Sequence, residues 1–306
     1  MSLHPQVKKL IDDMTKMREK PIHKMTIDEY RNMIKQFAGK SGKTEFVKHI
    51  NNRNIDGPYG KIPIRIYTPN DLKLKPAVMY FRGSGFVSGD LDEQDPICRA
   101  IANRSQCTVI AVGYRAAPEY KYPIGLEDSY TATRWVIEQA DELQIDPKRI
   151  SVSGYSSGGN FAALIVLKLR EQGIPIFSQI LLCPGLDLSC SMPSHEKYTH
   201  GYLLDKEDIR WYFNQYIPKG VNPKDSAISP LWENNLVGLP PTLIITAEYD
   251  PLRSEAELYA DKLIQAGVAV DYYCYEGHIH VMLACRSLLS FDVDPVDRVA
   301  EFLKKR

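Results

Sequence analysis

Apolar residues recur at helical spacing near the N-terminus and form short uninterrupted runs further along the chain. Between residues 7 and 17, and again between 30 and 37, apolar side chains return every three or four positions, as on the buried face of an amphipathic helix. Thr26 and Glu29 form a capping-box pattern at the start of the second segment. We therefore expect two helices before the first strand.

From residue 62 the pattern changes to that of strands. Segment 64–67 alternates apolar and polar residues and ends at Pro69, which predicts an antiparallel edge strand. Later runs are almost continuously apolar, which predicts strands buried on both faces; they are 77–81, 108–112, 150–152, 179–183 and 242–246. Helical patterns lie between them, at about 92–105, 126–139, 160–172 and 253–266. This alternation predicts an α/β fold, with a mostly parallel sheet flanked by helices.

Two stretches do not fit the alternation, namely the N-terminal helix pair and residues 190–238. The second stretch is rich in aromatic residues, and Trp211, Tyr212 and Tyr216 would share one side of a helix that begins near Asp205. Two interpretations are open for these aromatics. They could make ordinary core contacts, or they could belong to a lid that lines an apolar pocket.

Charge and cysteine content limit the kinds of partner and the cellular compartment that we expect. The 306 residues include 38 Lys or Arg and 38 Asp or Glu, so no overall field favours nucleic acid or an anionic membrane. We expect a small-molecule partner and no stable membrane association. The six cysteines are scattered without a C-x-x-C pair, and no secretion signal is visible at the N-terminus. We therefore expect a cytoplasmic protein without a structural metal.

The strongest chemical signal is the segment G-Y-S-S-G at 154–158. A short apolar strand precedes it and an apolar helical pattern follows. A serine at the tip of such a strand–turn–helix junction needs small neighbours, because the strained backbone leaves no room for a Cβ. Ser156 is therefore the candidate nucleophile. The alternative is a plain loop, because short Gly–Ser clusters are common.

A nucleophilic serine needs a base and an acid that orients the base. In α/β-hydrolase folds these residues follow the serine in the order acid, then histidine, at the ends of later strands. Asp250 lies just after the strand at 242–246, with Glu248 as its rival. His280 lies just after a strand-like segment, with His278 as its rival. Spacing alone does not separate the two histidines.

An oxyanion hole is expected from a glycine-rich loop after an early strand. The sequence R-G-S-G-F at 82–86 follows the strand at 77–81 and supplies such a loop, and Ser157 supplies the N–H that follows the nucleophile. The alternative is that Gly83 and Gly85 serve only a tight turn.

Several spaced motifs resemble those of the hormone-sensitive-lipase family of α/β-hydrolase esterases. The family's H-G-G-G-F resembles 82–86, N-Y-R-L-A-P-E resembles 113–119, G-D-S-A-G-G-N resembles 154–160, D-P-L-R resembles 250–253, and G-x-x-H resembles 277–280. The resemblance implies the α/β-hydrolase fold with a helical cap. It selects Asp250 and His280 over their rivals, and it places the oxyanion hole at Ser84, Gly85 and Ser157. Arg82 stands where the family has histidine.

The resemblance also implies a domain plan. Residues 1–55 would contribute helices to the cap, and 56–306 would form the catalytic domain, with 190–238 as a cap insertion. We expect a substrate pocket lined by five aromatic residues, namely Phe86, Tyr155, Tyr202, Trp211 and Tyr212. The family often dimerises through the last strand and helix, so a homodimer is also expected.

The function that follows is that of a serine carboxylesterase. It would hydrolyse short- to medium-chain acyl or aryl esters through an acyl-enzyme, with no cofactor and no metal. Two alternatives stay open on the same residues. One is a non-catalytic ligand-binding protein, for which the changes at Arg82 and Ser84 are the support. The other is related deacetylase, lactonase or amidase chemistry.

Overall fold

The protein is described by a computed structural model that covers residues 2–18, 20–38 and 44–305. The strands are β1 (His49–Ile55), β2 (Ile62–Thr68), β3 (Lys75–Phe81), β4 (Thr108–Val112), β5 (Ile145–Tyr155), β6 (Ser178–Leu182), β7 (Thr242–Tyr249) and β8 (Val270–Ile279). The α-helices are α1 (Pro5–Met17), α2 (Ile27–Ala38), α3 (Asp95–Ser105), α4 (Ile124–Glu138), α5 (Ser157–Glu171), α6 (Pro193–Lys197), α7 (Lys206–Tyr216), α8 (Arg253–Gln265) and α9 (Pro295–Lys304). Short 3₁₀ turns are η1 (Ile22–Lys24), η2 (Pro230–Trp232), η3 (His280–Met282) and η4 (Arg286–Leu288).

The strands form one eight-stranded sheet in the order β1-β2-β4-β3-β5-β6-β7-β8. The six strands β4, β3, β5, β6, β7 and β8 run parallel to one another, whereas β2 runs antiparallel to both of its neighbours, β1 and β4. The prediction of a mostly parallel sheet is therefore confirmed. In such a sheet the carboxyl ends of the parallel strands lie along one edge, where loops that carry functional residues gather.

The prediction that segment 64–67 forms an edge strand is wrong, because β1 lies outside β2 and occupies the edge of the sheet. The side chains of β1 are nearly all exposed or half-exposed, and only Ile55 is buried. A strand without a buried face has no apolar period, so the sequence pattern did not reveal it. The sheet therefore begins before residue 56, the predicted start of the catalytic domain.

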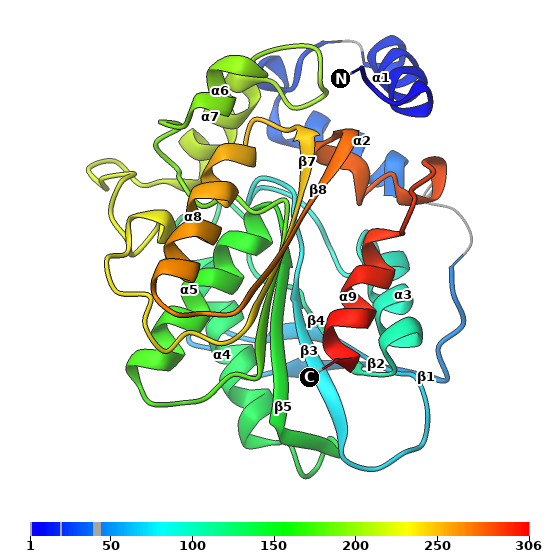
Figure 1. Cartoon of the computed structure of the whole chain (residues 1–306), viewed down its shortest axis with the longest axis vertical. Helices are drawn as coiled ribbons and strands as arrows, with labels where there is room; N and C mark the ends of the chain where they lie inside the picture. Colours follow the sequence, from blue (N-terminus) through cyan, green and yellow to red (C-terminus); the bar gives the residue numbers. More distant parts are fainter. Residues whose placement is uncertain (1, 19, 39–43, 306) are drawn as a thin grey trace.

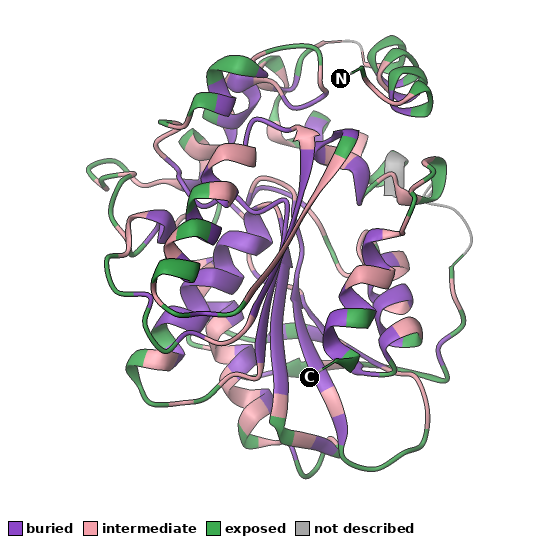
Figure 2. Ribbon diagram, viewed as in Figure 1, coloured by how far each residue is buried: buried purple, intermediate pink, exposed green. Residues whose placement is uncertain are grey.

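Helices cover both faces of the sheet (Figure 1). On one face α3 and α9 pack together, and Ile101 and Val299 join a core with Val78 of β3. On the other face lie α4, α5 and α8, and Phe161 of α5 and Tyr259 of α8 belong to a larger core. The central strands are buried along most of their length (Figure 2). No helix in the described ranges is long and apolar enough to cross a membrane.

The remaining helices gather over the carboxyl ends of the strands and form a cap (Figure 1). They come from two segments far apart in the sequence, α1 to α2 and α6 to α7. Asp208 of α7 joins the segments, because the His23 backbone N–H donates to its carboxylate at 3.0 Å. Arg31 of α2 donates to the Val87 carbonyl at 2.9 Å and to the Glu119 carboxylate at 2.7 Å. These bonds connect α2 to the loops that follow β3 and β4.

A mostly buried ion pair between Asp128 of α4 and Arg115, in the loop after β4, offers a test of this fold. Asp128 is fully buried and accepts from the backbone N–H of Arg115 at 3.0 Å and from its guanidinium. Removing one partner of a buried pair leaves the other charge uncompensated. We expect Asp128→Ala to lower the free energy of unfolding by about 3 kcal/mol, measured by urea denaturation.

Glu138 provides the control on the same helix. It forms an exposed pair with Arg134 at 2.8 Å, and exposed pairs contribute about 0.5 kcal/mol or less. Equal losses of stability in Asp128→Ala and Glu138→Ala would contradict the buried role given to Asp128.

Candidate active site

Ser156 sits on a sharp turn between β5 and α5. Its φ of 54° and ψ of −119° lie outside the regions that most residues adopt. A Cβ built on Gly154 would lie 1.9 Å from the Gly158 carbonyl oxygen, and a Cβ on Gly158 would lie 2.1 Å from the Phe81 carbonyl oxygen. Both positions therefore require glycine. The close approach allows the helix to start directly behind the serine.

Three side chains that the sequence placed on separate segments lie within hydrogen-bond reach of one another. His280 Nε2 lies 2.9 Å from Ser156 Oγ, and His280 Nδ1 lies 2.8 Å from Asp250 Oδ2. Asp250 also accepts from the Leu252 backbone N–H at 2.8 Å. Asp250 and His280 are buried, whereas Ser156 is half-buried. This is the geometry by which a carboxylate orients an imidazole toward a hydroxyl.

The rival residues lie elsewhere. The carboxylate of Glu248 accepts from the Gly277 backbone N–H at 2.7 Å. The imidazole of His278 lies 2.8 Å from the Glu276 carbonyl through Nδ1, and it stacks on the Phe291 ring. The structure therefore brings Asp250 and His280 to the serine, and it gives both rivals other partners.

The loop that follows β3 lies against the serine. A Cβ built on Gly83 would lie 3.1 Å from Ser156 Cβ. In the described part of the chain, the backbone N–H groups of Ser84, Gly85 and Ser157 have no hydrogen-bond acceptor. Unpaired N–H groups beside a nucleophile can stabilise an oxyanion.

Three consecutive residues of this loop, Ser84, Gly85 and Phe86, adopt positive φ. Ser84 has a φ of 121° and Gly85 a φ of 62°, so Ser84 holds a conformation that favours glycine. Its hydroxyl donates to the Ser88 carbonyl, and this bond helps to keep the strained loop in place. A Cβ on Gly85 would lie 2.3 Å from the Tyr212 ring, so α7 packs directly on the loop.

Arg82 lies beneath the same loop, with only 3% of its surface exposed. Its guanidinium donates to the carbonyls of Ser88 at 3.1 Å and Tyr114 at 2.8 Å. A third, longer bond reaches the Val112 carbonyl at 3.4 Å. The guanidinium also lies 3.7 Å above the centre of the Tyr114 ring. A buried polar group is tolerated when its donors are satisfied. The sequence showed Arg82 as a departure from a motif but not this anchoring.

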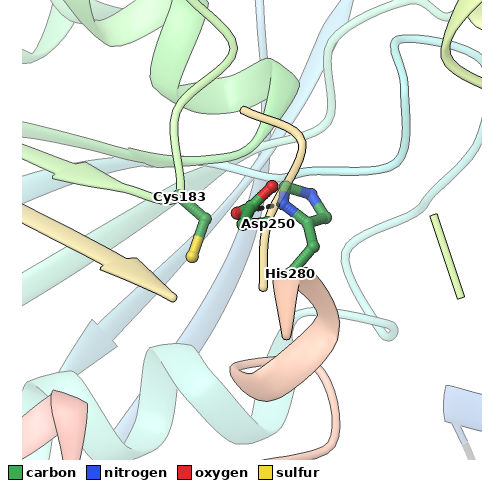
Figure 3. A group of neighbouring side chains, drawn as sticks. All are labelled: Cys183, Asp250 and His280. Atoms are coloured by element: carbon green, nitrogen blue, oxygen red, sulfur yellow. Dashed lines mark hydrogen bonds and ion pairs between the residues drawn. The ribbon is translucent and has the colours of Figure 1, made fainter. Parts of the chain in front are cut away.

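Cys183 lies next to Asp250 and His280, as Figure 3 shows. One ligand atom each from Cys183, Asp250 and His280 lies within 4.8 Å of the others, so the three could offer ligands to a soft or borderline metal ion. His280 Nδ1 and Asp250 Oδ2 already contact each other. A metal at this point would compete with that contact, so the triad geometry and metal binding exclude each other.

A cavity of about 400 Å³ opens beside Ser156. Its walls are mostly apolar and come from the cap, the loop after β3 and the segment after His280. Three of the five predicted pocket residues line it, namely Phe86, Tyr155 and Tyr212. Sequence reasoning missed the wall that α1 and α2 provide, which includes Met14 and Ile34. The resemblance places these helices in the cap, but no sequence pattern shows which of their side chains face the cavity.

The other two predicted pocket aromatics do not contribute to these walls in the described structure. Trp211 packs edge-on against Tyr212, with ring centres 5.3 Å apart. Tyr202 stacks on Tyr249, also at 5.3 Å. Both rings therefore pack against other aromatic rings, as expected if these aromatics make ordinary core contacts.

A buried acid–base pair lies between α6 and α8. His195 of α6 and Glu255 of α8 are fully buried, and His195 Nε2 lies 3.1 Å from Glu255 Oε2. Glu255 also accepts from the Leu186 backbone N–H at 2.6 Å. Burial raises the pKa of Glu255 to about 7, although the nearby imidazole opposes this rise. No sequence pattern indicates this pair, because His195 lies far from any strand end.

With this geometry established, comparisons with known proteins identify the family. A family model described as alpha/beta hydrolase fold matches residues 78–284. The chain therefore belongs to this family of α/β hydrolases, and the predicted resemblance to its hormone-sensitive-lipase-like members is confirmed. The predicted α/β-hydrolase fold is confirmed as well.

Relatives at about one-third identity are esterases by name. An ethyl acetate hydrolase of Pseudomonas putida is 34% identical over 93% of this chain and 92% of its own length. An arylesterase of Saccharolobus solfataricus is 32% identical over 92% of this chain and 93% of its own. Among solved structures, a hyperthermophilic esterase of Pyrobaculum calidifontis superposes with a TM-score of 0.92 at 33% identity, covering 100% of this chain and 99% of its own.

The raised pKa of Glu255 predicts a pH dependence of stability. A carboxyl whose pKa is near 7 when folded and near 4.5 when unfolded binds its proton more tightly in the folded state. Its stabilising contribution is therefore full below pH 4.5 and is lost as the pH rises through 7. Glu255→Gln removes this titration and keeps an acceptor for Leu186. We expect the free energy of unfolding of the variant, relative to wild type, to rise by about 2 kcal/mol between pH 5 and pH 8.

Urea denaturation at several pH values measures this difference. A difference that stays constant with pH would show that the Glu255 carboxyl does not titrate in this range. A difference that falls with pH would show that ionised Glu255 stabilises the fold through His195.

Proposed function

We propose that this protein is a serine carboxylesterase that hydrolyses short- to medium-chain acyl or aryl esters. The observation that carries the proposal is the continuous chain of contacts from Asp250 through His280 to Ser156, at the wall of an apolar cavity. The names of the relatives, an ethyl acetate hydrolase and an arylesterase, support the same chemistry.

In the first half of the reaction, His280 Nε2 takes the proton of the Ser156 hydroxyl as its oxygen attacks the ester carbonyl. Asp250 holds the imidazole through Nδ1 and stabilises its protonated form. The carbonyl oxygen becomes an oxyanion, which the N–H groups of Ser84, Gly85 and Ser157 stabilise. His280 then gives its proton to the leaving alkoxide, and an acyl-enzyme remains on Ser156.

In the second half, a water molecule replaces the alcohol. His280 accepts a proton from this water as the oxygen attacks the acyl carbonyl. The second tetrahedral intermediate uses the same N–H groups. Its collapse returns the proton from His280 to Ser156 Oγ and releases the carboxylic acid. This sequence of proton transfers needs no cofactor.

The cavity supports an apolar substrate of modest size. A volume of about 400 Å³ lies near the lower end of the range for small-molecule sites. Phe86 and Tyr212 present aromatic surface to it, which suits an acyl chain or an aryl group.

The compartment and assembly belong to the same proposal. All six cysteines, which lie within the described residues, are free thiols, and this supports a reducing cytoplasmic environment. The last strand, β8, lies at the edge of the sheet, and a homodimer built on β8 and α9 stays a prediction that size-exclusion chromatography would test.

The nucleophile is tested by Ser156→Ala, with p-nitrophenyl acetate, butyrate, hexanoate and decanoate as substrates. Removal of a triad nucleophile costs a factor of about 10⁴ or more in kcat. We therefore expect a rate that depends on chain length in the wild type and is lost in the variant.

The matched control is Ser153→Ala. Ser153 is a buried serine of β5, three residues before Ser156, and we expect this variant to keep wild-type rates. Equal rates in wild type and Ser156→Ala would remove Ser156 as nucleophile. No hydrolysis by the wild type would favour the ligand-binding alternative.

The acid and the base are tested against the rival histidine. Asp250→Asn keeps the shape of the side chain but cannot hold the productive imidazole tautomer, so we expect kcat to fall by a factor of about 10³ to 10⁴. His280→Gln should be similarly impaired. His278→Gln should stay within about threefold of wild type, because its ring contacts Phe291 and not the serine. The opposite ranking of the two histidine variants would overturn this assignment.

A further inference from the structure

Tyr155, the residue before the nucleophile, contacts the base, and its ring packs against the loop after β3. It ends β5 and is 8% exposed. Its hydroxyl donates to the His280 backbone carbonyl at 2.9 Å. Its ring is stacked on the His280 imidazole, with centres 5.6 Å apart and planes 21° apart. A Cβ built on Gly83 would lie 2.7 Å from Tyr155 Cδ1, so the same ring also packs against the loop.

We propose that Tyr155 is a positioning residue for the base, which holds the backbone of His280 by its hydroxyl and stabilises the protonated imidazole by its ring. The inference rests on the proposed esterase function. It concerns a position where the motif of the resembling family has aspartate and this chain has tyrosine.

The Tyr155 hydroxyl fixes the position of the His280 backbone. His280 lies at the point where β8 gives way to η3, and its Nε2 must stay within 2.9 Å of Ser156 Oγ. Small displacements of a catalytic group lower the rate strongly. Burial raises the pKa of the Tyr155 phenol well above its ordinary value, so the group remains an O–H donor across the working range of pH. The Tyr155 hydroxyl therefore limits movement of the turn that carries the base.

The Tyr155 ring stabilises the positive charge of the protonated imidazole. When His280 takes the serine proton it becomes a cation, and a cation within about 6 Å of an aromatic face is attracted to it. The other groups facing this imidazole are the Asp250 carboxylate, the Ser156 hydroxyl and the Cys183 thiol. Cys285 and Tyr80 are the further titratable groups near Tyr155. Asp250 is the one carboxylate among these groups, and the ring adds to its stabilisation of the cation.

Two variants separate the two contributions. Tyr155→Phe keeps the ring and removes the hydroxyl, and we expect kcat to fall about tenfold with KM within twofold of wild type. Tyr155→Leu removes both, and we expect kcat to fall about a hundredfold. In Tyr155→Leu the midpoint of the ascending limb of the kcat/KM pH profile should move about half a pH unit lower, since the protonated base loses its aromatic neighbour. In Tyr155→Phe this midpoint should not move.

The measurement uses p-nitrophenyl butyrate, with active sites counted by a fluorophosphonate that labels the reactive serine. Tyr259→Phe, in a buried tyrosine of α8, is the control and should match wild type. Where Tyr155→Leu does not fold, Tyr155→Met replaces it. Wild-type kcat per active site and an unchanged pH midpoint in the aliphatic variant would overturn the inference. Raised KM with unchanged kcat would overturn it too, and would make Tyr155 part of the substrate wall.

The two proposals fail in different ways. Retained hydrolysis in Ser156→Ala would overturn the esterase mechanism and the role of Tyr155 with it. Loss of hydrolysis in Ser156→Ala, together with wild-type behaviour in both Tyr155 variants, would overturn the role of Tyr155 alone.

Discussion

The contact between Gly158 and the end of β3 is the constraint on which the rest of the site depends. A Cβ at this position would lie 2.1 Å from the Phe81 carbonyl oxygen and 2.5 Å from that of Arg82, so the first turn of α5 rests directly on the backbone of the neighbouring strand. This contact fixes two features at once. It sets the sharp turn at Ser156, and it places the loop that begins at Arg82 beside the serine hydroxyl. The spacing between the Ser156 hydroxyl and the N–H groups of this loop is therefore a property of backbone packing.

The loop itself is held by unusual side chains. Arg82 and Ser84 replace smaller or neutral residues of the resembling family, and they anchor the loop through the same acceptor, the Ser88 carbonyl. The Tyr114 hydroxyl in turn donates to the Arg82 carbonyl at 2.9 Å, so the arginine and the tyrosine fix each other. Hydrogen bonds to charged groups are stronger than neutral ones, and a guanidinium offers several donors in one plane. The positive φ of Ser84 is tolerated because its neighbours fix the loop on both sides.

Much of this arrangement could be predicted from the sequence, and the limits have physical causes. The apolar runs gave the parallel strands, because burial on both faces leaves a continuous signal. The segment around Ser156 could be recognised because local backbone sterics require its glycines. The choice between His278 and His280 could not be made from spacing, since both lie near the same strand end. It depends on which ring faces Asp250 after the chain turns into η3, and only the motif register indicated this. The strand β1 escaped notice because it buries almost no side chain.

The pocket was the least predictable part, because its walls are built by tertiary contacts between the two cap segments and the catalytic body. Each segment is tied to a loop that carries part of the site. Arg31 of α2 binds the Val87 carbonyl, three residues after Ser84. Ser194 of α6 accepts from the Ser254 backbone N–H at 3.1 Å and donates to the Pro251 carbonyl, next to Asp250. Each cap segment is therefore hydrogen-bonded to a loop next to Ser84 or Asp250. The helices that shape the cavity are thus attached to the same loops that place Ser84 and Asp250 around Ser156.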